Sequence, residues 1–553
     1  MLMIIRVLLR KCKDLVIRNL ALMMCLLPAI TCGHTINPLN YGLLEAKSSV
    51  ERYNVLAACH KEAYITGAAV SYQGINLIEI EIPKGAIPMP LTITTDFCGV
   101  TLKIFNENQD VFLFEMINDR CKVDISGRDL HKNARLYKQE FITGCHMLMV
   151  QDDSLWVYRR RNKNYGAKRR DMLLVKNGVV QNEPVCSYDT PSSKPSVFLC
   201  NADFSGVRFG NITMIRDSCS TKKTYLVHFA NVYNLVLSNI NIITPNPQKL
   251  YADRVICCEN VFKMCLNNIR IEGTYSQIDK YGYGLDFNNI FDLRVNQMYA
   301  RSNWGIFGMN NVNCTTLKDC DINRFDIHCY GKDVKAKGCI FNDLYNQFSS
   351  VYGCVEFKDC VFNNFIPVLI ESSYNAYTPF NITFTKCLFN MNSKRNYLIN
   401  LLGLEEEHNS RPELSRKSLP NIFIQDCTVN FIENQRELVS NKGVPMWYVV
   451  KTGNVRYKET LDNISYITID GLSVSQSCEF DIFSNELCTT KPIYVIIKNM
   501  YTNCEDKCEK YIMPYATVDR KASVICNGKV VCRKTLVDRI FPYYTIWEKT
   551  MLN

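Results

Sequence analysis

A nine-residue phrase that recurs along the chain from residue 206 onward restricts the fold more than any other feature. Its second, fourth and seventh places are mostly apolar, and its sixth place is usually Asn, Asp or Gly. Consecutive copies begin 19 to 29 residues apart, except for two intervals of 40 and 45 residues. The copies begin at Gly206, Asn234, Lys263, Asp292, Cys314, Asp333, Cys354, Asn381, Asn421, Tyr466 and Tyr494.

This repeat predicts a solenoid of short stacked strands. One coil of three short strands needs roughly 20 to 30 residues, so the two long intervals hold inserted loops. Alternation such as Val236-Leu237-Ser238 indicates a strand, and Asn or Gly at the sixth place suits a bend with positive φ. Leucine-rich repeats have a similar period, but these phrases are rich in Val, Ile, Phe and Cys rather than Leu. We therefore expect an all-β fold, the right-handed parallel β-helix.

The cysteines follow the same repeat and predict an internal ladder with steps of about 4.8 Å. Small buried hydrophobic residues are favoured over stacked metal ligands, because no His or carboxylate shares the inward register. We expect no metal site and no cofactor. The ladder consists of the seventh places of five successive copies, Cys320, Cys339, Cys360, Cys387 and Cys427.

Further cysteines gather near the C-terminus, outside this ladder. In an exported protein they predict disulfides, and a zinc site made of four thiolates is the alternative. Residues 504–553 are therefore expected to form a disulfide-prone C-terminal extension. The sequence pairs are Cys478 and Cys488, Cys504 and Cys508, and Cys526 and Cys532.

The N-terminus has the pattern of a signal peptide. An apolar run from Asn19 to Ile30 follows several basic residues and precedes the small residues Thr31, Cys32 and Gly33. We expect residues 1–32 to be a leader, and the protein to be secreted, periplasmic or on the cell surface. Simple cleavage and a lipid anchor on Cys32 are both compatible with this pattern. No later segment reaches about 18 apolar residues in a row, so we expect no transmembrane segment.

The rest of the chain divides by pattern into a cap with first coils (33–104), an insertion or early coils (105–200) and the parallel β-helix (201–503). The net charge of +10 includes a basic cluster between 159 and 170. That cluster fits a solvated loop, a contact for an acidic polymer or a nucleic-acid patch. Export makes nucleic acid an unsuitable partner. We expect a monomer.

The segment ahead of the repeats is predicted to cap the open end of the solenoid. Ser48 or Ser49 precedes a run with Val50, Tyr53 and Leu56, which indicates a capped helix. The alternating residues 78–85 (IEIEIPKG) then indicate a strand and a turn. This layout resembles the pectate-lyase-like superfamily, whose members often begin with such a helix and a "VxIPxGxY" strand. The resemblance implies the β-helix fold; the acidic GDG-TDD element of that family is absent.

A narrower resemblance covers about residues 150 to 450. Residues 158–178 and 303–328 (NWGIFGMNNVNCTTLKDCDINRFDIH) are similar to motifs of uncharacterised bacterial β-helix proteins, including "RWGIMGxNxxKNLxxxxCxxSRFDAH". The family's later GHMGI element is missing, and a later Arg is replaced by a residue near Glu371.

A candidate site follows from the second motif. Arg324, Asp326 and His328 alternate with Phe325 and Ile327, so all three polar side chains are expected to stand outward in a row on one strand. Arg can bind a uronate carboxylate, and Asp beside His can serve as base and acid. The alternative is that Asp326 merely pairs with Arg324 and His328 and keeps the strand soluble.

Neighbouring coils are expected to complete a sugar site. Asp326 and His328 follow the start of their repeated phrase by a fixed number of residues. Adding the same number to the starts of the flanking phrases gives Trp304 and Ile306 on one neighbouring coil and Tyr345 and Gln347 on the other. Aromatic side chains stack on pyranose rings, and Glu371 is a weaker candidate two coils along. Asp286 could support the site or be solvated.

Two functions remain open from the sequence. The first is a polysaccharide lyase or glycoside hydrolase that acts on an acidic glycan containing uronate. The second is a non-catalytic surface protein that binds glycan or serves as a rigid spacer. No phosphate-binding glycine loop, HExxH motif or nucleophile elbow is present.

Overall fold

The structure is a computed structural model of the 553-residue chain. It describes residues 34–158, 166–186, 188, 194–245, 254–273, 283–301, 305–342, 345–349, 351–363, 366–371, 380–391, 397–402, 419–431, 446–452, 464–474, 479–483, 487–488, 493–499, 501–502, 516–517, 522–526 and 529–534.

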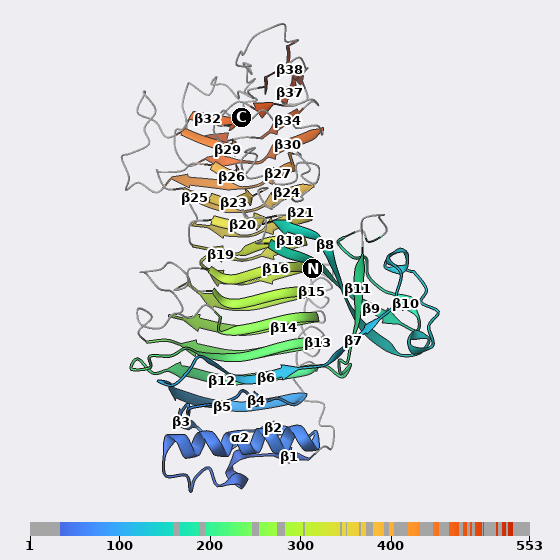
Figure 1. The fold of residues 1–553 in the computed structure, drawn as a ribbon. Coiled ribbons are helices and arrows are strands. Elements are labelled where there is room, and N and C mark those ends of the chain that lie inside the picture. Colours follow the sequence, from blue (N-terminus) through green and yellow to red (C-terminus); the bar gives the residue numbers. More distant parts are fainter. Residues whose placement is uncertain are drawn as a thin grey trace, which may run out of the picture.

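The described strands form a tall stack in which strands pair in parallel with strands of the next coil. β13 (Thr224–Ile243) pairs with β14 (Ile256–Glu272), which pairs with β15 (Tyr283–Ala300). Within the described ranges, 31 strands join in this one sheet. Figure 1 shows them rising from helix α2 (Ser49–Thr66) to the C-terminal strands. The parallel β-helix predicted from the repeat is confirmed.

The remaining strands of the stack follow in chain order. The lower coils contain β1 (Thr35–Ile36), β2 (Ala69–Ser71), β3 (Leu77–Glu81), β4 (Met89–Pro90), β5 (Thr94–Phe105), β6 (Val111–Ile117) and β12 (Val207–Arg216). The middle coils contain β16 (Gly305–Lys318), β17 (Asp321–Ile322), β18 (Asp326–Lys337), β19 (Ile340–Phe341), β20 (Tyr345–Ser349), β21 (Val351–Lys358), β22 (Val361–Phe362) and β23 (Ile366–Glu371). The upper coils contain β24 (Asn381–Thr385), β25 (Leu388–Met391), β26 (Tyr397–Leu402), β27 (Asn421–Gln425), β28 (Thr428–Phe431), β29 (Met446–Thr452), β30 (Ser465–Asp470), β31 (Ser473–Val474), β32 (Glu479–Phe483), β34 (Ile493–Lys498), β35 (Tyr501–Thr502), β37 (Ala522–Cys526) and β38 (Lys529–Lys534).

The sixth place of the repeated phrase is the turn that the sequence predicts. In all eleven copies this residue has a positive φ, between 47° and 76°. Asparagine tolerates this left-handed conformation and also bonds its counterpart one coil away. The side-chain amide of Asn239 donates to Asn211 (2.7 Å), and that of Asn268 donates to Asn239 (2.9 Å). The turn and the stacking are therefore supplied by the same residue.

A second asparagine ladder, which the repeat phrase does not contain, is buried at another corner. Asn231, Asn260, Asn289 and Asn311 all have positive φ and are at most 5% exposed. Each later residue donates its side-chain amide to the one before, over 3.0, 2.8 and 2.8 Å. Such a satisfied chain of amides allows polar groups to lie in a dry corner.

The predicted cysteine ladder is an interior feature. All five cysteines are at most 2% exposed and are free thiols. The backbone amide of Cys387 donates to the sulfur of Cys427 over 3.4 Å, which places successive members on neighbouring coils. They pack in the same core as Phe341, Phe362 and Phe389. The expected role as small core residues fits this environment.

Helix α2 covers the lower end of the stack, as predicted. Ser48 is its N-cap, and its hydroxyl accepts a hydrogen bond from the amide of Glu51 in a capping box. The buried face includes Tyr53, Leu56 and Cys59. A helix across the first coil protects strand edges that would otherwise pair with another chain.

An antiparallel sheet of five strands lies beside the middle of the stack (Figure 1). Its strands, in sheet order, are β10 (Val179–Val180), β9 (Gly166–Lys176), β8 (Cys145–Tyr158), β11 (Pro195–Cys200) and β7 (Arg120–Val123). We call this unit the side sheet. It leaves the stack after β6 and returns to it before β12.

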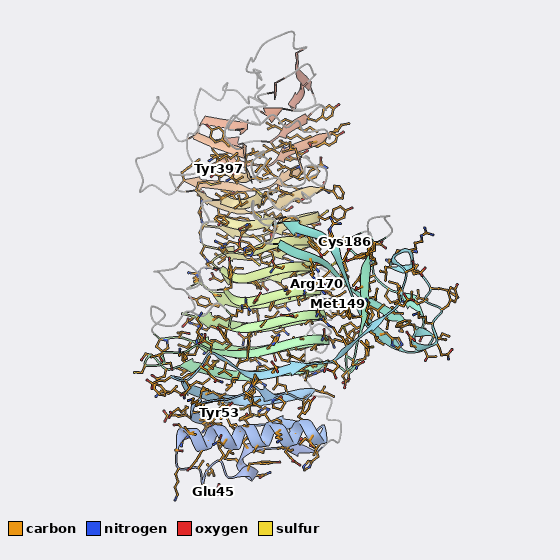
Figure 2. The ribbon with its side chains drawn as sticks, in the orientation of Figure 1. Glu45, Tyr53, Met149, Arg170, Cys186 and Tyr397 are labelled. Atoms are coloured by element: carbon orange, nitrogen blue, oxygen red, sulfur yellow. The ribbon has the colours of Figure 1, made fainter. Side chains whose placement is uncertain are left out.

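The side sheet is fastened to the buried asparagine ladder. The backbone carbonyl of Arg170 accepts hydrogen bonds from the side chains of Tyr330 (2.9 Å) and Asn311. Met149 and Met172 pack with Phe262 of the stack in one apolar cluster. Figure 2 shows Met149 and Arg170 on the side of this sheet that meets the stack. In the basic cluster, Lys168, Arg169 and Arg170 are half-buried on β9, whereas residues 159–165 lie outside the described ranges.

Several expectations concern residues that the structure does not describe. The leader (1–32) with Cys32 is among them, and the side chains of the C-terminal cysteine pairs are too. At the upper end, β37 pairs in parallel with β34 and antiparallel with β38. β33 (Leu487–Cys488) and β36 (Ala516–Thr517) form a separate pair. Among the described residues, no helix is both long and apolar enough to cross a membrane.

Candidate functional site

The start of β18 carries the three predicted catalytic residues. Phe325 and Ile327 belong to the hydrophobic core, so the alternating Arg324, Asp326 and His328 face away from it, as the alternation predicts. The prediction of an exposed row is wrong, however. Their exposed fractions are 2%, 0% and 5%. The row is an enclosed polar cluster on the outer side of the core.

Aromatic residues of neighbouring coils account for part of this burial. The guanidinium of Arg324 lies 4.6 Å from the ring centre of Tyr345 on β20. The ring of Tyr283 on β15 meets His328 edge-on at 5.5 Å, and the Tyr283 hydroxyl lies 3.4 Å from Nε2 of His328. The sequence indicates a neighbouring coil for Tyr345, but it gives no sign of the contact between Tyr283 and His328, which are 45 residues apart.

The three polar side chains form an ion-pair group centred on Asp326. Nε of Arg324 donates to Oδ2 of Asp326 over 2.6 Å, and Nη2 contacts the same oxygen. Nε2 of His328 lies 3.8 Å from that oxygen. Burial alone would lower the pKa of Arg324, but the carboxylate of Asp326 outweighs it and the pKa is raised. The contacts match the alternative from the sequence in which Asp326 pairs with Arg324 and His328. Because the three residues are buried, they do not make the strand soluble.

The register places Gln347 directly beside Asp326. Tyr345, two residues earlier, then stands beside Arg324. On the other side, Met309 pairs with Ile327, so the preceding residues Gly308 and Asp326 are neighbours. Trp304 lies outside the described residues, as does the side chain of Ile306. The sequence prediction counted each position from the repeated phrase that precedes its strand, and this count shifts the register. The strands of neighbouring coils align instead when positions are counted back from the repeated phrase that follows each strand.

Glu371 takes part in the same outer face through its backbone. Ser349 follows two residues after Gln347 and pairs with Glu371 at the end of β23. Ile327 pairs with Phe348, so His328, Ser349 and Glu371 follow one another on successive coils. The side chain of Glu371 is not among those described. Its place two coils from His328 agrees with the sequence interpretation.

The line of residues through Asp326 continues downward to Asp286. Asp286 pairs with Gly308, which is the neighbour of Asp326. Nε of Arg254 lies 3.0 Å from Oδ2 of Asp286. Burial raises the pKa of Asp286, although Arg254 acts in the opposite direction. We call this line, from Glu115 through Asp286 and Asp326 to Gln347, the outer column.

Below Asp286 the outer column contains residues that the sequence interpretation missed. Cys257 pairs with Asp286, His228 pairs with Cys257, and Glu115 pairs with His228. None of them belongs to a repeated phrase. Aligning each strand on the phrase that follows it is the signal that would have brought them into one line.

Above Gln347 the same face becomes aromatic and apolar. Ile366, Leu369 and Tyr397 are buried together, with Tyr345 and Tyr448 packed against them. Tyr397 pairs with Tyr448 across neighbouring coils. The ammonium of Lys451 lies 5.0 Å from the ring centre of Tyr397. A cation thus lies over a tyrosine ring at Arg324 and again at Lys451, whose strand β29 (Met446–Thr452) lies four coils above β18.

A shallow cavity of about 590 Å³ lies elsewhere, along the exposed asparagine ladder. Asn211, Asn239 and Asn268 line it together with Arg270. Arg270 is engaged by Glu272 and by the ring of Tyr299. The cavity offers amide groups but no carboxylate or histidine among its lining residues, so the outer column is the stronger candidate for chemistry.

Comparisons with known proteins identify the architecture. No family model matches the chain, and no curated protein matches it. The tailspike gp54 of Acinetobacter baumannii bacteriophage AP22, solved with a capsular saccharide, aligns at a TM-score of 0.55 and 12% identity, over 89% of this chain and 79% of that one. The tailspike gp49 of Pseudomonas phage LKA1 aligns at 0.52 and 11% identity, over 84% and 81%. At such low identity the likeness defines the class of fold, a parallel β-helix.

Proposed function

We propose that the protein binds and cleaves a polysaccharide along the outer column, with Asp286 and Asp326 as the reacting carboxyl groups. The observation that carries the proposal is their place in one column with Gly308 between them. Two coil steps of about 4.8 Å separate their backbones. Inverting glycoside hydrolases hold their two carboxyl groups roughly 6.5–9.5 Å apart.

The two carboxyl groups have different environments, as acid and base roles require. Burial raises the pKa of Asp286, which favours a proton on this group and suits a general acid. Asp326 is paired with Arg324, and this contact keeps the carboxylate charged. Asp326 is therefore assigned as the base, with His328 beside it at 3.8 Å.

The glycan is proposed to be acidic and to contain uronate. Arg254 and Lys451 supply positive charge along this face, and the half-buried Tyr345 supplies an aromatic ring for sugar stacking. The resemblance to phage tailspikes supports a glycan ligand, because the AP22 protein was solved with a capsular saccharide. Gln347 and Glu371 extend the binding region along the stack.

The leader pattern also supports export, and we propose that the exported protein is a monomer. Export places the protein where extracellular polysaccharides occur. Cell fractionation and sedimentation of the purified chain would test both points. Release of labelled lipid with the protein would distinguish an anchor on Cys32 from simple cleavage.

A non-catalytic glycan binder or spacer is the second candidate. It is favoured by the complete burial of Asp326, whose oxygen Oδ2 is occupied by Arg324. A general base that activates a water molecule must be reached by that water. Binding without turnover therefore remains a distinct outcome of the experiment.

The test incubates the purified full chain with a panel of polysaccharides that contain uronate. New reducing ends would report hydrolysis, whereas absorbance of unsaturated products would report a lyase. Asp286→Asn is expected to abolish hydrolysis while glycan retention in affinity electrophoresis persists. Asp321→Asn is the matched control, because Asp321 forms an ion pair with Arg301 away from the column. Retention without turnover would establish the binder, and neither retention nor turnover on any glycan would refute both functions.

A further inference from the structure

A cluster of three potential metal ligands lies along the outer column, on the two coils below Asp286. His228 on β13 pairs with Cys257 on β14, and Glu259 follows two residues after Cys257 on the same strand. One ligand atom from each residue lies within 4.8 Å of the other two. Residues at such positions share one face of the sheet.

The mixture of donor atoms selects the class of metal. An imidazole nitrogen, a thiolate sulfur and a carboxylate oxygen together suit zinc and similar divalent transition metals. Calcium and magnesium prefer oxygen alone, so the sulfur of Cys257 disfavours them. Neighbouring strands of a rigid stack hold the three backbones in place, which lowers the entropy cost of assembling the site.

The orientation of His228 fits a metal ligand. Its Nδ1 lies 3.5 Å from Oε2 of Glu115, and Phe112 stacks on its ring at 5.2 Å. Its Nε2 is buried and has no hydrogen-bond partner among the described residues. Metal-binding histidines commonly use one ring nitrogen for a carboxylate and the other for the metal. A bound cation would satisfy the nitrogen that the protein leaves open.

The charges around the cluster favour a cation. Glu115 and Glu259 contribute two carboxylates on the coils that adjoin β13, whereas Asp286 above them is paired with Arg254. Like charges close together in a partly buried region repel each other. A divalent ion at the cluster would offset the excess negative charge.

We infer that His228, Cys257 and Glu259 form a binding site for a zinc-class divalent metal ion, with one further position open to water or a ligand. Ligand atoms around tetrahedral zinc lie about 3 to 4 Å apart, given bonds of about 2.0–2.3 Å. Closing the cluster therefore requires side-chain rotations that move the atoms by about an ångström. The site departs from the sequence prediction of no metal, which considered the inward cysteines and the C-terminal cysteine pairs but not His228, Cys257 and Glu259 together.

The inference is tested by Co²⁺ titration of the reduced full chain, followed by absorption spectroscopy. A bound thiolate gives a charge-transfer band in the near ultraviolet, and tetrahedral Co²⁺ absorbs in the visible. Wild-type protein is expected to bind one more equivalent of thiolate-ligated Co²⁺ than Cys257→Ser. His228→Gln and Glu259→Gln should weaken this equivalent, and Zn²⁺ should displace the Co²⁺.

Matched controls separate this site from the other cysteines. Cys265→Ser changes a half-buried thiol on the same strand that bonds Asn267, and it should leave the spectrum unchanged. Glu115→Gln should keep the band but weaken affinity roughly 10- to 100-fold, as is usual for carboxylates that orient metal-binding histidines. Equal stoichiometry and equal spectra in wild type and Cys257→Ser would overturn the assignment. Because the readout is metal binding, this result is independent of any glycan activity.

Discussion

Asp286 and Asp326 stand in the same outer column of the stack, separated only by the glycine rung of Gly308. A residue with a side chain at the middle rung would fill the space between the carboxylates. Gly308 places no side chain at this rung. Forty residues separate the two aspartates in the sequence, so the coil geometry alone makes them neighbours.

The first prediction concerns Asp286 and the rate of glycan cleavage. Asp286→Asn removes the proposed acid, and we expect turnover to fall by about 10²- to 10⁴-fold, the usual contribution of such a group. The thermal midpoint should change little, because the ion-pair partner of Asp286 among the described residues is the exposed Arg254. Initial rates of reducing-end formation would measure the loss. A variant that cleaves as fast as the wild type would remove Asp286 from the mechanism.

The second prediction concerns the stability contributed by the buried pair of Arg324 and Asp326. Asp326→Asn removes the carboxylate that accepts from Nε of Arg324 inside the protein, and we expect the free energy of unfolding to fall by about 3–5 kcal/mol. The double variant Arg324→Met with Asp326→Leu should be less destabilised, because no buried charge is left alone. Denaturant titration of the three proteins provides the comparison. Equal loss in the single and double variants would contradict it.

The third prediction concerns His60, a completely buried histidine of helix α2. Its Nδ1 donates to the carbonyl of Pro90, and its Nε2 accepts from the hydroxyl of Tyr72 at 2.8 Å. Burial lowers the pKa of His60 to about 4, against a weaker opposing effect of the Pro90 contact. The unfolded chain therefore binds a proton more readily than the folded one between these pKa values.

The sign of this effect is a loss of stability on acidification. Stability is retained above the unfolded pKa of about 6.5 and is lost progressively down to about pH 4, by up to about 3 kcal/mol. His60→Gln can keep both hydrogen bonds but does not titrate. The difference in unfolding free energy between the two proteins should therefore change across this pH range. A constant difference would show that His60 does not contribute.

The fourth prediction concerns the buried asparagine ladder. Asn260→Ala removes the amide that donates to Asn231 and the oxygen that accepts from Asn289. We expect a loss of about 1–3 kcal/mol for each buried partner left without its hydrogen bond. Asn268→Ala interrupts the exposed ladder and should cost less, because water can replace the lost contact. Thermal denaturation of both variants tests this order, and an equal cost would argue against the role of burial.

The fifth prediction concerns the cysteine ladder. The five ladder thiols are buried, whereas Cys98, Cys121 and Cys219 are exposed. Brief treatment of the native protein with an alkylating reagent should modify the exposed cysteines and spare the ladder. Peptide mass spectrometry locates the label. Early modification of Cys339 or Cys360 would contradict the packing.

The sequence predicts the stack well because its signals are local. The turn residues at the sixth places and the inward cysteines depend on alternation within one strand. The exposure of Asp326 was predicted wrongly for a different reason. Its burial arises together with contacts such as that of Tyr345 with Arg324, which depend on register and not on alternation.

The register itself was the second source of error. Counting from the preceding phrase ignores differences in loop length between the phrase and the next strand. Gln347 lies 21 residues after Asp326, the same distance as between the following phrases at Asp333 and Cys354. The cluster of His228, Cys257 and Glu259 was missed because no motif unites residues on separate coils.

The attachment of the side sheet limits how this architecture can change in length. The sheet departs below β12 and is fixed higher up, where Arg170 meets Asn311 and Tyr330. The distance between these two attachment points therefore fixes the number of coils that lie between them. Deleting or duplicating one of them would displace its anchor by one rung, about 4.8 Å. In the described part of the chain, the side sheet makes no such contact with the coils above Tyr330, so we expect gains and losses of repeats in homologous chains to fall in the upper part.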